Sequence, residues 1–182
     1  MASKWPELLK EIAPRVNRIA ILLNPATTAL FAEAFLKPFK ATAASFGVQA
    51  IMAPVNDRSE LEPIIAAQAR EPNSGLVAMP DSFLVDHRVE VTSLAARHRL
   101  PALYNYRSFT EVGGLMSYGN NPLVNYRRSA TYVHRILKGE KPSELPVQLP
   151  VQYELVINLK TAKALGIDLP PTLLVRADEV IE

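Results

Sequence analysis

Polar and aromatic side chains follow four of the apolar runs in this sequence, and their types suit the binding of a small charged molecule. They are Asn24, Thr27, Thr28, Asp81, Ser82, Tyr104, Tyr106, Tyr118 and Asn120. Amide and hydroxyl groups at the start of a helix favour an anion such as a carboxylate, because free N–H groups and the helix dipole point toward it. Aromatic rings and a carboxylate favour a cation. Together these groups predict a site for a small zwitterion.

Each of these residues also has an ordinary structural interpretation. Asn24 and Thr27 have the residue types that cap helices, and Asp81 can cap the helix that follows it. Tyrosines in strands are usually half-buried with a wetted hydroxyl. The shared position of the set favours binding, because ligands of open α/β sheets lie beyond the carboxyl ends of the strands.

Catalytic and cofactor chemistry finds little support. The segment 114–119 reads G-L-M-S-Y-G, one residue longer than the nucleophile-elbow motif. The seven glycines form neither nucleotide-binding fingerprint, and the chain contains no cysteine. The three histidines lie on predicted helices without the spacing of metal ligands, and we expect them to be solvated. We therefore predict no catalytic residue, no metal and no cofactor.

Asp81 also allows a signalling function as the alternative to binding. Asp81 at the end of the third predicted strand resembles the phosphoacceptor of receiver domains. Those domains also need an acidic pair after the first strand and a lysine after the fifth, where this chain has Asn24 and Gly119. A flavodoxin-like signalling or sensor domain, or a domain that modifies small molecules, stays the alternative function.

The apolar runs predict how these residues are positioned. Five runs rich in strand-forming residues alternate with helical patterns, at 18–23, 48–55, 75–79, 101–106 and 114–119. Several are apolar throughout, as in strands covered on both faces. The pattern predicts a Rossmann-like or flavodoxin-like α/β fold with a doubly wound, mainly parallel five-stranded sheet.

The intervening segments carry helical patterns. Apolar residues recur every three to four positions at Phe31, Phe35, Phe39, Ala43 and Phe46, and Pro38 is expected to bend that helix. Ser59 with Glu62 and Ser108 with Glu111 have the capping-box pattern, and a third helix is predicted over 86–99. The clearest helix covers 123–137, with one apolar face, basic residues expected to face solvent, and Gly139 after its end.

The last part of the chain departs from this alternation. Residues 140–182 are rich in proline and predict an extended strand, a short helix near 161–165 and a tail. We expect residues 1–139 to form the ligand-binding lobe, and residues 140–182 to form a returning segment that packs elsewhere. With 182 residues, one globular domain of ordinary size is expected.

Composition bounds the partners. The 20 Lys+Arg and 18 Asp+Glu are spread along the chain, whereas nucleic-acid binding needs a concentrated basic stripe. We therefore expect no nucleic-acid partner. No apolar run approaches the length of a membrane-spanning helix, and no apolar stretch of a signal peptide follows Met1.

Three separated segments carry a resemblance to a known family. They are ELLKEIAPRVNRIAILLNP, LAARHRLPALYNYRSFTEVGGLMSYGNN and YELVINLKTAKALGIDLPPTLLVRADEVIE. In this order they resemble the ABC-transporter substrate-binding proteins of the type I periplasmic-binding fold, in the group associated with tryptophan and tyrosine uptake. The resemblance covers the second lobe and the returning C-terminal segments of such proteins, and the first lobe has no counterpart in the chain.

The resemblance implies a function without chemistry. Two lobes would close on a solute, with an aromatic amino acid expected, and the closed form would be presented to an ABC permease outside the cytoplasm. It implies that Asn24, Thr27 and Thr28 face a carboxylate and Asp81 an ammonium, with the tyrosines as walls and Asn120 as a further hydrogen-bonding group. Residues 147–165 would then lack their partner lobe, so we expect a homodimer or swapped arrangement through the C-terminal tail, residues 140–182.

Overall fold

The computed structural model describes residues 1–150 and 152–182, and one seven-stranded sheet runs through it in the order β2-β1-β3-β4-β5-β6-β7. The strands are β1 (Arg18–Leu23), β2 (Gln49–Pro54), β3 (Ser74–Ala78), β4 (Ala102–Tyr104), β5 (Met116–Asn120), β6 (Tyr153–Asn158) and β7 (Glu179–Ile181). The first five pair in parallel in the order 2-1-3-4-5. The doubly wound sheet and its five predicted strands are thereby confirmed, within a few residues at each end.

Ten α-helices are described, together with two short 3₁₀ turns, η1 (Arg58–Glu60) and η2 (Pro142–Glu144). The helices are α1 (Lys4–Ile12), α2 (Pro25–Thr28), α3 (Ala32–Ser45), α4 (Leu61–Arg70), α5 (Ser82–Asp86), α6 (Arg88–Arg97), α7 (Arg107–Glu111), α8 (Pro122–Leu137), α9 (Leu159–Leu165) and α10 (Pro171–Arg176). None of these described helices is both long enough and apolar enough to cross a bilayer.

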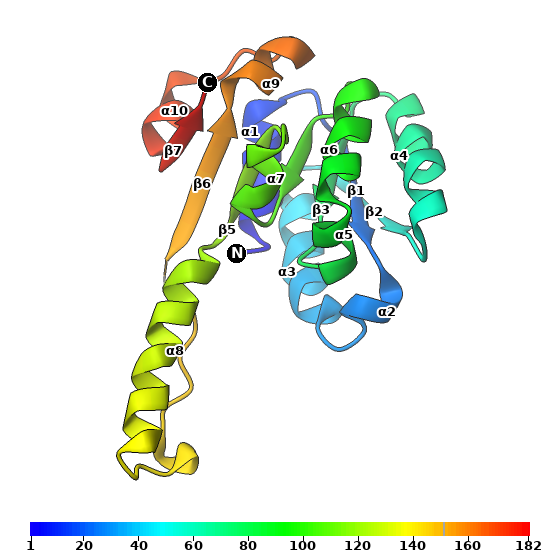
Figure 1. Cartoon of the computed structure of the whole chain (residues 1–182). Helices are drawn as coiled ribbons and strands as arrows, with labels where there is room; N and C mark the ends of the chain where they lie inside the picture. The colour runs from blue at the N-terminus through cyan, green and yellow to red at the C-terminus, as the bar shows by residue number, and fades with distance from the viewer. Residues whose placement is uncertain (151) are drawn as a thin grey trace.

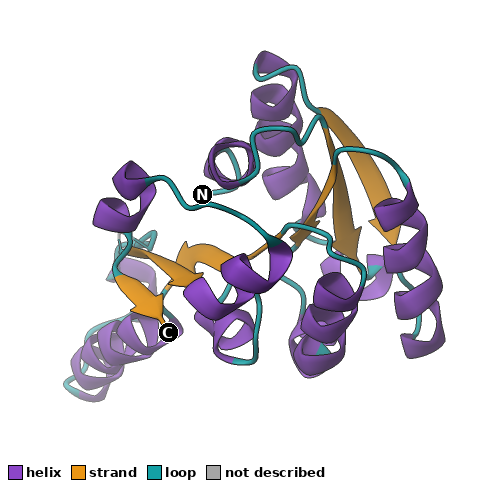
Figure 2. Ribbon diagram, turned by 90° about the horizontal axis from the view of Figure 1, so that it is seen from above, coloured by secondary structure: helices purple, strands orange, loops and turns teal. Residues whose placement is uncertain are grey.

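Helices cover both faces of the sheet, as the view from above shows (Figure 2). Alternation along β1 explains the two layers, because Ile19 and Ile21 point to one face while Ala20 and Leu22 point to the other. The first face packs on α1 and α3, around the fully buried Trp5. The second packs on α4, α5, α6 and α7. The central strands β1 and β3 are almost wholly buried because helices cover both of their faces.

The last two strands correct the predicted strand number. β6 pairs antiparallel with β5 of the same chain, and β7 pairs parallel with β6. The expectation that residues 147–165 lack a partner is therefore wrong for β6. The sequence predicted an extended strand in this part of the chain but not its place in the sheet, because an antiparallel neighbour reached by a long connection has no βα signature.

Arg107 connects β6 and β7 to α7 through ion pairs. Its guanidinium lies 2.8 Å from Glu111, 2.8 Å from Glu154 of β6 and 2.9 Å from Glu179 of β7. The three carboxylates raise the pKa of Arg107, with the hydrogen bond to Glu111 as the largest cause. One side chain thus joins α7, β6 and β7.

Helix α8 stands away from the sheet, with the segment 140–150 returning along it (Figure 1). None of its residues is buried, and on its apolar face Leu123, Tyr126 and Leu137 are 64%, 75% and 82% exposed. Tyr132 donates a hydrogen bond to the carbonyl of Pro146, and Arg128 bonds to Gln148. The structure therefore groups α8 with the returning segment, and the division at residue 139 stays a prediction. Val151 lies outside the described residues.

Several helix boundaries differ from the sequence patterns. The helix predicted over 86–99 is confirmed as α6, but the short α5 that precedes it and α1 near the N-terminus have no counterpart among the predicted helices. Neither predicted capping box forms: Ser59 donates to Asp57, which caps η1, and Ser108 lies inside α7. The predicted glycine after α8 is confirmed, because Gly139 has φ of 98°.

Candidate functional site

A cavity of about 400 Å³ opens at the carboxyl ends of β1 and β3, at the edge of the sheet where a ligand is expected. The residues that line it are Thr27, Phe31, Pro80, Asp81, Ser82, Val85, Asp86 and Tyr106. They come from the loop after β1, from the loop after β3 with α5, and from the segment after β4. Thr27, Asp81, Ser82 and Tyr106 of the predicted set are brought together here.

The carboxylate of Asp81 joins two of these loops. It accepts hydrogen bonds from the backbone N–H of Asn24 at 2.5 Å and from Oγ1 of Thr27 at 2.6 Å. It also caps α5 by accepting from the N–H groups of Phe83 at 2.8 Å and Leu84 at 3.4 Å. Three of these bonds reach Oδ1 and one reaches Oδ2, so both carboxylate oxygens are already bonded within the protein. Asp81 is 3% exposed, so its charge is held inside the wall of the cavity.

Asn24 caps α2, and Thr28 at the end of the same turn bonds back to it. Oδ1 of Asn24 accepts from the N–H groups of Ala26 and Thr27, and its Nδ2 donates to the carbonyl of Asn56. The hydroxyl of Thr28 donates to the carbonyl of Asn24 at 2.8 Å. Both side chains are buried and do not line the cavity. The structural interpretation of these two residues therefore applies.

Two aromatic rings and a free carboxylate supply other parts of the wall. Phe31 is 37% exposed, and Tyr106 is half-buried at the start of α7. Burial raises the pKa of the Tyr106 phenol, so the ring is a neutral wall at physiological pH. Asp86 is exposed, and no described residue forms an ion pair or hydrogen bond with its carboxylate. The cavity is apolar in its walls and negative in charge.

The other predicted residues lie elsewhere. Tyr104 is buried in the core, where its ring stacks on Phe109 at 4.9 Å, and burial raises its pKa. Tyr118 stacks on Tyr153 of β6 at 5.9 Å, beside a smaller cavity of about 250 Å³. Asn120 ends β5 opposite Tyr153. Tyr104 is buried on the short β4. Tyr118 and Asn120 lie on β5, which β4 separates from β3, so they are not at the cavity between β1 and β3.

Several residues of this edge lie outside the predicted set of site residues. Phe31, Val85 and Asp86 line the cavity, although the sequence pattern placed Phe31 in a helix stripe and Asp86 at a helix start. Asn105 is fully buried after β4, and neither of its side-chain polar atoms has a partner. Gly119 on the next strand approaches the carbonyl of Asn105 so closely that an added Cβ would lie 1.7 Å from its oxygen. No sequence signal distinguishes this close approach from an ordinary strand glycine.

Comparison with known proteins places the chain in a family. The model of the ABC transporter substrate binding protein family matches residues 2–181, and the chain belongs to this family. No curated protein matches. Within the described residues, no three side chains of His, Asp or Glu gather as a metal site.

Three solved structures illustrate the fold. A conserved domain protein from Vibrio cholerae has a TM-score of 0.89 and 27% identity, covering 98% of this chain and 60% of that one. An ABC domain from Streptococcus pneumoniae in complex with L-Trp has a TM-score of 0.89 and 25% identity, covering 99% and 60%. CD0873 from Clostridium difficile, a substrate binding protein with adhesive properties, has a TM-score of 0.69 and 22% identity, covering 96% and 58%, and shows the fold alone.

The chain therefore spans about 60% of the length of the first two of these proteins. The resemblance to the second lobe of a type I periplasmic-binding protein is confirmed by the family and by the lobe structure.

Proposed function

We propose that this chain is the second lobe of the solute-binding component of an ABC importer, and that it binds an amino acid, with an aromatic one expected, without chemistry. The proposal rests on one cavity that combines Phe31 and Tyr106 with the carboxylates of Asp81 and Asp86. The family of the chain and the L-Trp held by the Streptococcus pneumoniae relative support it.

The hydrogen bonds and the exposure of the side chains at the cavity indicate which part of the solute each one contacts. Asp86 is our choice for the ammonium of the solute, because its carboxylate is exposed and bonds to no described residue, whereas Asp81 is buried and already accepts four hydrogen bonds. Asp81 adds its negative charge and holds the hydroxyl of Thr27 in place. Ser82 is exposed at the rim and can donate to the solute carboxylate. The rings of Phe31 and Tyr106 supply the apolar contact.

The open side of the cavity indicates that another lobe completes the site. Ligand sites usually enclose 70–90% of a small molecule, and a cavity with exposed Thr27, Ser82 and Asp86 cannot do so alone. A first lobe accounts for the relatives' additional length. It would pack on the apolar face of α8 and close over the cavity, outside the cytoplasm and in contact with a permease.

A calorimetric panel of amino acids tests the proposal, using this chain and a longer protein in which it is joined to a first lobe. We expect tryptophan or tyrosine to bind the two-lobed protein, and to bind this chain at least about tenfold more weakly because less of the solute is buried. Asp86→Asn should weaken binding about tenfold, as expected for a lost charged hydrogen bond. Phe31→Ala should weaken it as well.

Phe46→Ala is the matched control, since Phe46 is 44% exposed at the far end of α3 and lines no part of this cavity. Its affinity should equal that of the wild type. The proposal fails if sugars or nucleotides bind the two-lobed protein while no amino acid does. It also fails if Asp86→Asn and Phe31→Ala bind as the wild type does.

A further inference from the structure

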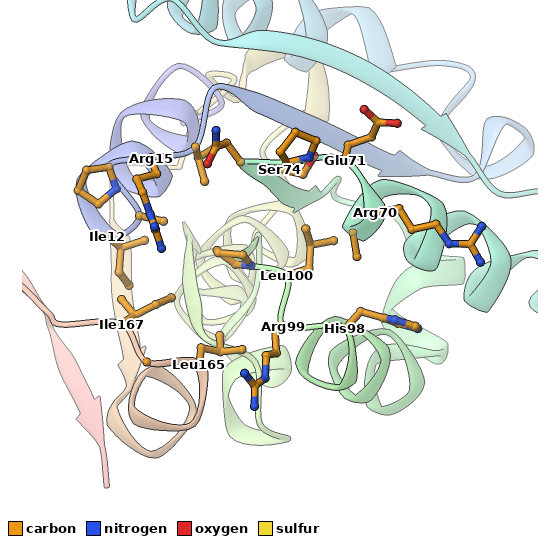
Figure 3. A pocket seen from close by; sticks show the side chains of 18 of the residues that line it. Ile12, Arg15, Arg70, Glu71, Ser74, His98, Arg99, Leu100, Leu165 and Ile167 are labelled. Atoms are coloured by element: carbon orange, nitrogen blue, oxygen red, sulfur yellow. The ribbon is translucent and has the colours of Figure 1, made fainter.

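A second cavity, of about 590 Å³, lies at the opposite edge of the sheet, where β1, β3 and β4 begin. Its walls come from the loops before these three strands and from the segment after α9 (Figure 3). It is larger than the cavity of about 400 Å³ at the carboxyl edge. The proposed solute site uses none of its residues, and a lobe that covers the carboxyl edge would leave it open.

Three arginines from three different parts of the chain line this cavity. They are Arg15 before β1, Arg70 at the end of α4 and Arg99 before β4. All three are exposed, and none forms an ion pair or a side-chain hydrogen bond with another described residue. In Figure 3, Arg15 lies on one side of the cavity, Arg70 on the other, and Arg99 beside Leu165. Guanidinium groups without partners are ready-made donors for carboxylate or phosphate oxygens.

The backbone at this cavity adopts an uncommon conformation. Asn73 and Arg99 have φ of 55° and 51°, and no other described residue except glycine has a positive φ. Arg99 is the second residue after α6, in the position where glycine is usual. The next amide, Leu100 N–H, donates to the carbonyl of Ala95 at 2.9 Å. An arginine costs more than glycine in the left-handed region, and such strain is often found at binding sites.

Two polar atoms at the cavity lack partners. Ser74 is 7% exposed, and its hydroxyl forms no hydrogen bond with a described residue. Nε2 of His98 is also buried and has no partner among the described residues. The sequence pattern predicted a solvated histidine here, and this nitrogen is not solvated. Buried polar atoms are normally bonded, and a ligand that reaches them would remove this cost.

The cavity also contains two carboxylates, of Glu71 and Asp168, which reduce its positive charge. The Glu71 side chain points away from the other labelled residues in Figure 3. With three arginines against two acids, the cavity has an excess of one positive charge when its histidine is neutral. Apolar side chains such as Ile12, Leu100 and Ile167 complete the wall.

We propose that this cavity binds a small organic polyanion, with two or more carboxylate or phosphate groups carried on an apolar skeleton. The separated arginines favour several anionic groups over one, and the aliphatic wall favours an organic molecule over a bare ion. Arg15, Arg70 and Arg99 would each contact an anionic group.

Citrate and inorganic phosphate are the probes, tested on this chain by calorimetry and thermal unfolding at constant ionic strength, with acetate as the monovalent comparison. We expect saturable binding of citrate and a rise in the unfolding temperature of at least about 2 °C. Acetate should give neither. Inorganic phosphate, a bare ion, should bind more weakly than citrate, and binding of equal strength would contradict the preference for an organic skeleton.

Variants distinguish a specific site from a general response to salt. Arg99→Gly should weaken citrate binding about tenfold or more, although it should leave the unfolding temperature equal or higher, because glycine accepts φ near 51°. Arg70→Gln should weaken citrate binding similarly. Arg127→Gln on α8 removes the same charge from an exposed residue far from the cavity and should change nothing. Citrate binding that is absent, or that survives in the Arg99→Gly, Arg70→Gln double variant, would overturn the proposal.

Discussion

The hydroxyl of Thr27 donates a hydrogen bond to Oδ1 of Asp81 over 2.6 Å, and so joins the loop after β1 to the loop after β3. Because Oδ2 of the same carboxylate accepts from the amide of Asn24, two hydrogen bonds hold the two loops together. This bridge gives the cavity between them a fixed floor before any solute arrives.

Removal of the bridge should cost stability as well as binding. Asp81→Ala leaves several N–H and O–H donors without an acceptor, and we expect the free energy of unfolding to fall by about 2–4 kcal/mol. Urea denaturation measures this change. Asp86→Asn is the comparison at the same cavity: it should weaken solute binding while its unfolding midpoint stays within error of the wild type. Equal stability of Asp81→Ala and wild type would contradict the bridge.

The close approach of β5 to Asn105 predicts a large effect of a small substitution. Gly119→Ala would place a methyl group 1.7 Å from the carbonyl oxygen of Asn105, and backbone on both sides prevents an easy shift. We expect a loss of about 3 kcal/mol or more in the free energy of unfolding. Gly139→Ala, with φ of 98° but no atom within 4 Å of the added group, should cost less. Thermal unfolding orders the two variants, and the reverse order would refute the contact.

The exposed apolar face of α8 predicts self-association of the chain when no first lobe covers it. Light scattering should give a dimer at micromolar concentration, because a long apolar face seeks a partner. Leu137→Glu, at a residue 82% exposed, should shift the dimer to a monomer. Val175→Glu on α10, at a residue 86% exposed, tests whether any new surface charge has this effect and should stay dimeric. A monomer at every concentration would show that α8 does not mediate pairing.

The sequence predicted the parts of the fold that depend on local pattern. The five parallel strands follow from apolar runs that end at polar residues, as at Leu23 and Asn24. The glycines at 139 and 166 mark helix ends, and both have a positive φ. The strand β6 could not be placed, because its pairing with β5 joins residues separated by the whole of α8 and its returning segment.

The site could be predicted as an edge of the sheet but not as a set of side chains. Position after a strand placed Thr27, Asp81, Ser82 and Tyr106 at the cavity. It could not distinguish Tyr104, whose ring stacks on Phe109 in the core, from Tyr106, which lies two residues later at the cavity wall. The hydrogen bonds that Asp81 accepts from the loop after β1, and the absence of a partner for Asp86 among the described residues, depend on contacts between loops that no local pattern records.

The detour of the chain through α8 has a consequence for the order of folding. β5 ends at Asn120 and its neighbour β6 begins at Tyr153, so the sheet gains its sixth strand only after the residues between them have been synthesised and turned back. Closing a loop of that length is entropically costly and slows folding. The 2-1-3-4-5 sheet should therefore assemble first, with Met116 to Asn120 as a temporary open edge. Arg107, which contacts both Glu154 and Glu179, would then secure the late strands once they arrive.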